Sequence, residues 1–141
     1  MSKAIVWFRN DLRLHDNEAL HTAIAAHDEV LFVYVFEPFW WGNDAFGMQK
    51  TGAFRTKFLL ESVQELRVNI QSRGSDLVIR HGNTATELRK IREEFNFEHV
   101  YFHLGFADEE TKLEKPLTRR NLSFFLIFGN TQCNIMCQQY L

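Results

Sequence analysis

A run of five apolar residues near the N-terminus constrains the fold of this chain more than any other feature. The run spans residues 4–8 and reads AIVWF. Its length and unbroken apolarity are typical of a strand buried on both faces of a parallel sheet. Alternating charges follow at Arg9, Asp11 and Arg13. Ligands of open parallel sheets bind outside the carboxyl ends of the strands, so these charges lie where a binding site would be. From the residue types alone we favour a simpler role, an ion-pair lattice that only fixes the loop.

A helix is expected directly after these charges. Asp16 or Asn17 can serve as its N-cap, and Glu18 in the first turn interacts favourably with the helix dipole. Its apolar residues recur at helical spacing on one face: Ala19, Leu20, Ala23 and Ile24. A buried strand, a charged loop and a capped helix together open an α/β unit.

The same alternation continues along the chain. Further strands are predicted at Val30–Phe36, Asp76–Arg80, His99–Phe102 and Leu122–Phe128. A second helix is predicted at 51–72, and its apolar face holds Phe54, Phe58, Val63, Leu66 and Ile70. A third helix is predicted to begin at a capping box formed by Thr84 and Glu87. A fourth is predicted at 112–120, where Pro116 interrupts the helical pattern. Five strands alternating with four helices predict an α/β fold. We expect a Rossmann-like, doubly wound, five-stranded parallel sheet with helices on both faces, in three α/β/α layers.

The segment between the second strand and the second helix is rich in aromatic residues. Phe39, Trp40, Trp41 and Phe46 lie within it, and a bare aromatic patch of this size is unfavourable in water, so we expect these side chains to be buried. They could fold back over the edge of the sheet. They could also line a pocket for a planar ligand or a docking face for another domain.

Length and charge exclude some classes of protein. The chain has 141 residues, enough for one domain whose core needs neither disulfides nor metal. Its formal charge is −2, and no basic run is longer than a pair such as Arg119-Arg120. A domain that gripped a nucleic-acid backbone by itself should carry a basic patch. Autonomous DNA binding is therefore not expected.

Neither export nor a metal site is indicated by the sequence. The N-terminus enters a strand without the basic and apolar segments of a signal peptide. No apolar run approaches the roughly 20 residues of a membrane span, so we expect a cytoplasmic protein without a membrane partner. Cys133 and Cys137 have no histidine or second cysteine pair nearby. We therefore interpret them as two incidental thiols, with no metal.

Two long motifs resemble one known family. Residues 7–13, WFRNDLR, with Asp16-Asn17 after them, are similar to the opening motif of the DNA photolyase and cryptochrome family. Residues 46–55, FGMQKTGAFR, running into FLLESV, resemble the pattern of the DASH-type cryptochromes. The resemblance covers roughly residues 3–131, which we take as one α/β domain. The Trp40-Trp41 pair departs from the sequence that is usual in the family at this position.

Acidic residues follow the predicted strand at 99–102. They stand where a helix should begin, so stabilisation of a helix N-terminus would explain them. A carboxylate at the carboxyl end of a strand can also accept two parallel N–H bonds from an aminopyrimidine ring. The resemblance implies this second role, because Asp108 and Glu109 match the family position that holds a pterin. With Arg9 they are the predicted cofactor contacts, and Glu109 is the predicted ring contact.

The resemblance also implies a function for the complete protein. It would bind 5,10-methenyltetrahydrofolate as a light-harvesting pigment and pass energy to FAD, which would repair pyrimidine dimers in DNA or serve as a photoreceptor. FAD and DNA would be bound through a large helical domain that this chain does not contain, and that domain is the expected partner. We therefore expect no catalysis from the chain alone.

Two other interpretations stay open. The chain could be a stand-alone nucleotide-binding α/β domain, although it lacks a phosphate-binding glycine loop. It could also be a protein-interaction domain without photochemistry, as the aromatic segment suggests. Residues 121–141 carry none of the chain's 34 charged residues, and the segment 132–141 is treated as a tail of unknown structure.

Overall fold

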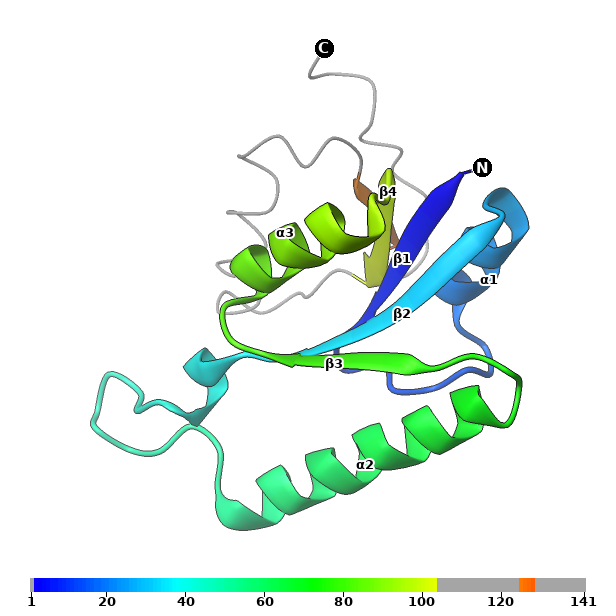
Figure 1. Cartoon of the computed structure of the whole chain (residues 1–141). Coiled ribbons are helices and arrows are strands. Elements are labelled where there is room, and N and C mark those ends of the chain that lie inside the picture. Colours follow the sequence, from blue (N-terminus) through cyan, green and yellow to red (C-terminus); the bar gives the residue numbers. More distant parts are fainter. Residues whose placement is uncertain (1, 104–124, 129–141) are drawn as a thin grey trace.

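A five-stranded parallel sheet forms the centre of the molecule (Figure 1). The computed structural model describes residues 2–103 and the strand at 125–128. The strands lie in the order β3-β2-β1-β4-β5, and every neighbouring pair is parallel. Their bounds are β1 Lys3–Phe8, β2 Glu29–Phe36, β3 Leu77–His81, β4 His99–His103 and β5 Phe125–Phe128. The predicted α/β class, with its five-stranded parallel sheet, is confirmed.

Helices cover both faces of this sheet. Their bounds are α1 Glu18–Ala26, α2 Ala53–Gln71 and α3 Thr84–Phe95, with a short 3-10 helix, η1, at Pro38–Trp41. Side chains of α1 and α2 pack on one face, and side chains of α3 pack on the other. The chain order reverses between β1 and β4, and in folds of this kind ligands bind at such a switch point. The helix predicted at 112–120 and the tail from 132 lie outside the described residues, so both stay predictions.

Strand β1 is the centre of the core because both of its faces are buried. Ala4, Val6 and Phe8 join the cluster under α1 and α2, whereas Ile5 and Trp7 join the cluster under α3. This division follows from the two-residue period of a strand. None of these five side chains is more than 5% exposed, as expected for a central strand of a parallel sheet.

Asparagine side chains cap the starts of α1 and α3. Asn17 caps α1, with its Oδ1 accepting from the Leu20 N–H at 3.0 Å. Asn83 caps α3 and accepts from the Thr86 N–H at 3.2 Å. The predicted Thr84–Glu87 capping box is therefore wrong, because Thr84 is already the first residue of the helix. Its hydroxyl has a partner directly after β2, described below.

Three residues predicted on apolar helix faces are exposed instead. They are Ile24 on α1 and Phe54 and Phe58 on α2. The buried residues of α2 are confined to its later turns, at Val63 and beyond. The spacing of these residues is helical, but Phe54 and Phe58 do not pack on the core. Within the described residues, no helix combines the length and the apolarity needed to cross a membrane.

Candidate functional site at the carboxyl edge of the sheet

Arg9 follows β1 directly and is held in place at the switch point. Its guanidinium carbon lies 4.9 Å from the centre of the Trp7 ring and 6.0 Å from that of Phe102 on β4. Its Nη1 donates to the carbonyl oxygen of His103 at 3.2 Å. Stacking on two aromatic rings and one hydrogen bond fix the cation. Arg9 therefore bridges the ends of the two strands between which the chain order reverses.

The other charges of this loop mainly organise the loop itself. Asp11 accepts from the Arg9 N–H at 3.2 Å and from the side-chain amide of Asn17 at 3.1 Å. His103 Nε2 lies 3.3 Å from Asp11 Oδ2 and 3.2 Å from Asn17 Oδ1. Arg13 is exposed, and its carbonyl oxygen accepts from Asn17 at 3.1 Å. The predicted role of Asp11 in a lattice that fixes the loop agrees with these contacts.

A cavity of about 250 Å³ opens beside Arg9, between the ends of β1 and β2 and the start of α2. Aromatic rings make up much of its wall. Its aromatic and charged lining residues are Trp7, Phe8, Arg9, Tyr34, Glu37, Trp40, Trp41, Arg55 and Phe58. Burial raises the pKa of the Tyr34 hydroxyl to about 12, so this phenol stays neutral. A pocket with flat apolar walls and a few polar groups is suited to a planar ligand.

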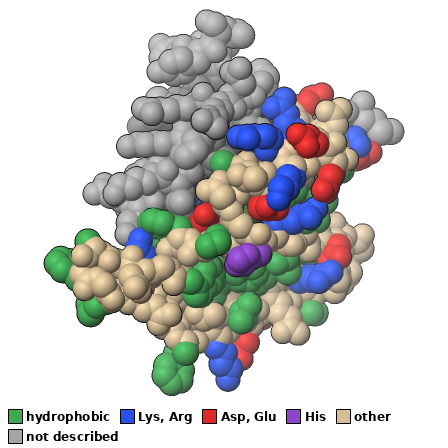
Figure 2. All heavy atoms as spheres, turned by 60° about the vertical axis from the view of Figure 1, so that its left-hand side comes forward, with side chains coloured by type: hydrophobic (Ala, Val, Ile, Leu, Met, Phe, Trp, Pro, Cys, Tyr) green, Lys and Arg blue, Asp and Glu red, His purple; other side chains and the backbone are tan. Residues whose placement is uncertain are grey.

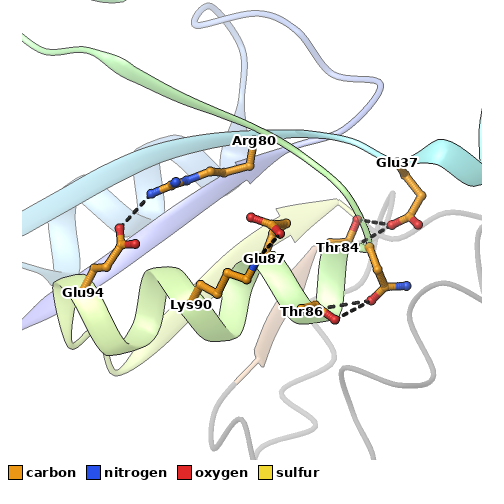
Figure 3. A network of polar contacts seen from close by, with 8 residues as sticks. Glu37, Arg80, Thr84, Thr86, Glu87, Lys90 and Glu94 are labelled. Carbon is orange, nitrogen blue, oxygen red and sulfur yellow. Dashed lines mark hydrogen bonds and ion pairs between the residues drawn. The ribbon is translucent and has the colours of Figure 1, made fainter.

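Glu37 stands at the end of β2 and ties the cavity wall to α3 (Figure 3). Its Oε2 accepts from the N–H of Thr84 at 2.6 Å and from its hydroxyl at 2.7 Å. Its other oxygen, Oε1, has no hydrogen-bond partner among the residues that the structure describes. No sequence motif pointed to Glu37 as a site residue. An acidic side chain between a buried strand and Pro38 was the available signal.

The aromatic segment after β2 is only partly buried. Trp40 and Trp41 are half-buried on η1, and the Trp41 indole N–H donates to the hydroxyl of Thr56 on α2 at 2.9 Å. The Thr51 hydroxyl donates to the carbonyl oxygen of Trp40 at 2.6 Å. Phe46, in contrast, is almost fully exposed, so the expectation that it would be buried is wrong. The two tryptophans line the cavity, as one of the interpretations proposed.

The structure tests the predicted cofactor contacts only in part. Arg9 lies on the cavity and at the end of β1, where it was expected. Asp108 and Glu109 lie outside the described residues, so their roles stay predictions. His81 is exposed at the end of β3.

The fold and the site define a class of protein, a doubly wound α/β domain with an aromatic cavity at the carboxyl edge of its sheet. Residues 4–130 match the family model described as DNA photolyase. This chain belongs to the DNA photolyase family, as its two sequence motifs suggested.

Individual relatives support this membership. The chain is 48% identical over 111 residues to blue-light photoreceptor PHR2 of Arabidopsis thaliana, covering 79% of this chain and 25% of PHR2. It is 43% identical over 117 residues to the cryptochrome DASH of Solanum lycopersicum, covering 82% of this chain and 20% of that protein. The crystal structure of a Synechocystis cryptochrome superposes with a TM-score of 0.84 at 33% identity, covering 92% of this chain and 27% of the neighbour. The chain thus spans about a quarter of the length of these relatives.

Proposed function

We propose that this chain is the light-harvesting domain of a DASH-type cryptochrome or photolyase, and that it binds a folate pigment at the carboxyl edge of its sheet. One observation carries the proposal. In a member of this family, an aromatic cavity of about 250 Å³ adjoins an arginine that is already fixed by two rings and a carbonyl oxygen. Flat walls and a preset cation favour a planar ligand with an anionic tail.

The proposed pigment is 5,10-methenyltetrahydrofolate. When bound, it would absorb near-ultraviolet or blue light and supply that energy to FAD. The residues of this chain would bind and orient it. Arg9 offers a cation to its carboxylates, while Asp108 and Glu109, a few residues beyond the end of β4, would accept N–H bonds from the pterin ring.

A specific observation favours a second position for the ring. Glu37 is buried at the cavity, and its Oε1 has no partner in the described part of the chain. A carboxylate oxygen in that state can accept an N–H from a heterocycle inside the cavity. In this arrangement the ring would lie between the ends of β1 and β2, and Arg55 on the same cavity would contact the ligand.

The activity of a complete protein follows as a further part of the proposal. The region that matches this chain makes up only about a quarter of these relatives, and we propose that FAD is bound by a helical partner domain. Light-driven repair of pyrimidine dimers, or light sensing, would take place there, and DNA would be contacted only through the complete protein. We propose no catalysis by the 141 residues alone, and the cytoplasm as their compartment.

Titration of the 141-residue chain with methenyltetrahydrofolate, followed by the pigment's absorbance, tests the proposal. Glu109→Gln should weaken binding by about 1 to 3 kcal/mol, because a charge-assisted hydrogen bond is lost. Glu110→Gln, its sequence neighbour, is the matched control and should bind like the parent. Equal affinity of Glu109→Gln and the parent removes Glu109 from the site. Weaker binding by Arg55→Ala, with Glu109→Gln unchanged, would place the ring in the cavity instead.

A further inference from the structure

Strand β3 forms one edge of the sheet. Among the residues that the structure describes, β2 pairs with one side of β3 and no strand pairs with its other side. The strand runs across the molecule between α2 and α3 (Figure 1). In Figure 2 hydrophobic side chains lie open across the middle of the surface, beside groups of charged side chains. An exposed strand edge can pair with a strand of another chain, so β3 is a candidate interaction surface.

The backbone of β3 offers hydrogen-bonding groups at this open side. The Gly82 N–H, directly after the strand, donates to the carbonyl oxygen of Phe36 on β2 at 3.1 Å. Because successive residues of a strand direct their backbone groups to opposite sides, Leu77 and Ile79 direct theirs away from β2. The Leu77 N–H accordingly donates to the side chain of Asp76 at 2.8 Å and not to β2. Ile79 therefore presents an N–H and a C=O at the open side.

Two apolar side chains border the open side of β3. Ile79 is 38% exposed, and Leu60 on α2 is 52% exposed. Arg67 of α2 bonds Asp76, just before β3, at 2.8 Å. From this contact, Leu60 lies two turns back along α2 and Ile79 lies three residues along β3, and both steps cover about 10 Å. Leu60 and Ile79 therefore lie at the same level on one flank. We call this flank, with the open side of β3, the β3 edge.

The β3 edge is complementary to itself. If two copies pair antiparallel around Val78, then Leu77 of one copy lies opposite Ile79 of the other. The same pairing places Asp76 opposite Arg80 at both ends, so opposite charges meet. Moving the two-fold axis by one residue would place Val78 opposite Arg80, and moving it by two residues would place Arg80 opposite Arg80 of the second copy. Like charges directly opposite destabilise such a pair, so the register around Val78 is favoured.

We propose that the β3 edge pairs with the same edge of a second copy of this chain, so that the two sheets join into one continuous sheet. Backbone hydrogen bonds and the exposed apolar side chains would supply the affinity. Asp76 is ion-paired with Arg67, and Arg80 is ion-paired with Glu94, so pairing would join them in a network of alternating charge. Exposed ion pairs of this kind contribute little affinity but select the register. No residue of β3 lines the cavity, so the inference does not depend on a bound pigment.

Sedimentation equilibrium of the 141-residue chain measures this association. The mean mass should rise from 16.7 kDa toward twice that value as the concentration is raised to about 1 mM. Ile79→Lys places a charge near the centre of the pairing and should weaken the association at least about tenfold. Ile24→Lys is the matched control, because Ile24 is 54% exposed and lies on α1, which contacts β1 and β4. The control should associate like the parent.

Disulfide crosslinking tests the register. Val78→Cys and Ile79→Cys are prepared separately in a chain that also carries Cys133→Ser and Cys137→Ser. In the proposed register the two Val78 positions form a non-hydrogen-bonded pair with Cα atoms about 4.5 Å apart, within the range of a disulfide. We expect crosslinked dimer to form at least about tenfold faster at position 78 than at position 79, whose counterpart is diagonal. A chain that stays monomeric up to about 1 mM, association that survives Ile79→Lys, or crosslinking at position 79 as fast as at position 78 would overturn the proposal.

Discussion

The contact between Glu37 and Thr84 is expected to be among the most important single polar contacts for stability. Glu37 is 7% exposed and Thr84 is 3% exposed. One carboxylate oxygen accepts two hydrogen bonds from Thr84, at 2.6 and 2.7 Å, and thereby joins the end of β2 to the first residue of α3. Removing the carboxylate leaves a buried N–H and a buried hydroxyl without a partner.

The magnitude follows from these two bonds. A hydrogen bond to a charged group contributes about 1.5 to 3 kcal/mol, and two bonds to one oxygen are less than additive. We therefore expect Glu37→Ala to lower the free energy of unfolding by about 3 kcal/mol. Thr84→Val removes only the hydroxyl bond and should cost about 1.5 kcal/mol, the lower end of that range. The free energy of unfolding of a domain is about 5 to 15 kcal/mol, so the alanine variant should still fold.

Urea unfolding, followed by tryptophan fluorescence, provides the assay. Both variants should shift the midpoint without changing the m value, because the folded structure is otherwise retained. Glu93→Ala is the control: Glu93 is an exposed acidic residue on the same helix, and its loss should change stability by no more than about 0.5 kcal/mol. If Glu37→Ala costs no more than Glu93→Ala, the bond pair does not stabilise the fold and the reasoning is refuted.

Two further predictions concern the loop after β1 and the amino ends of the strands, where His99 begins β4. Asn17→Ala should destabilise by about 2 kcal/mol or more, because this fully buried side chain caps α1 and also bonds Asp11. Asp16→Asn, one residue earlier, should cost far less, and equal losses in a thermal melt would contradict the assignment of the cap. Burial, and then the nearby charge of His27, lowers the pKa of His99 below its ordinary value of 6.5. The unfolded chain therefore binds more protons, and stability should fall as the pH drops below about 6.5. Urea midpoints at pH 7.5 and 5.5 should differ less for His99→Gln than for the parent, and an unchanged difference would contradict the lowered pKa.

The sequence pattern predicted the sheet well, because burial on both faces is what makes the central strands continuously apolar. The run at residues 4–8 has no polar position, so only a strand covered on both faces accommodates it, and the structure confirms this. Helical periodicity wrongly predicted that Phe54 and Phe58 would be buried. Spacing shows which residues share a face of α2, but not how far along the helix the core extends, and the buried residues begin at Val63.

The polar contacts of the site were harder to predict because their partners are distant in sequence. Thr84 and Glu87 have the spacing of a capping box, yet the Thr84 hydroxyl bonds Glu37, 47 residues earlier. Glu87 accepts instead from the Lys90 ammonium group at 2.8 Å. Arg9 was predicted at the edge of the sheet from its place after a strand. Its stacking on Phe102 depends on β4 lying beside β1, which the local sequence does not encode.

Thermal melts of the 141-residue chain with and without ligands test the central claim most directly. Methenyltetrahydrofolate, ATP and NAD are each added in excess to separate samples, since a ligand that binds only the folded state raises the melting temperature. The account predicts that the folate raises it, that ATP and NAD leave it unchanged, and that Glu109→Gln reduces the folate effect. A rise with ATP or NAD, and none with the folate, would contradict the account and identify the chain as a nucleotide-binding domain.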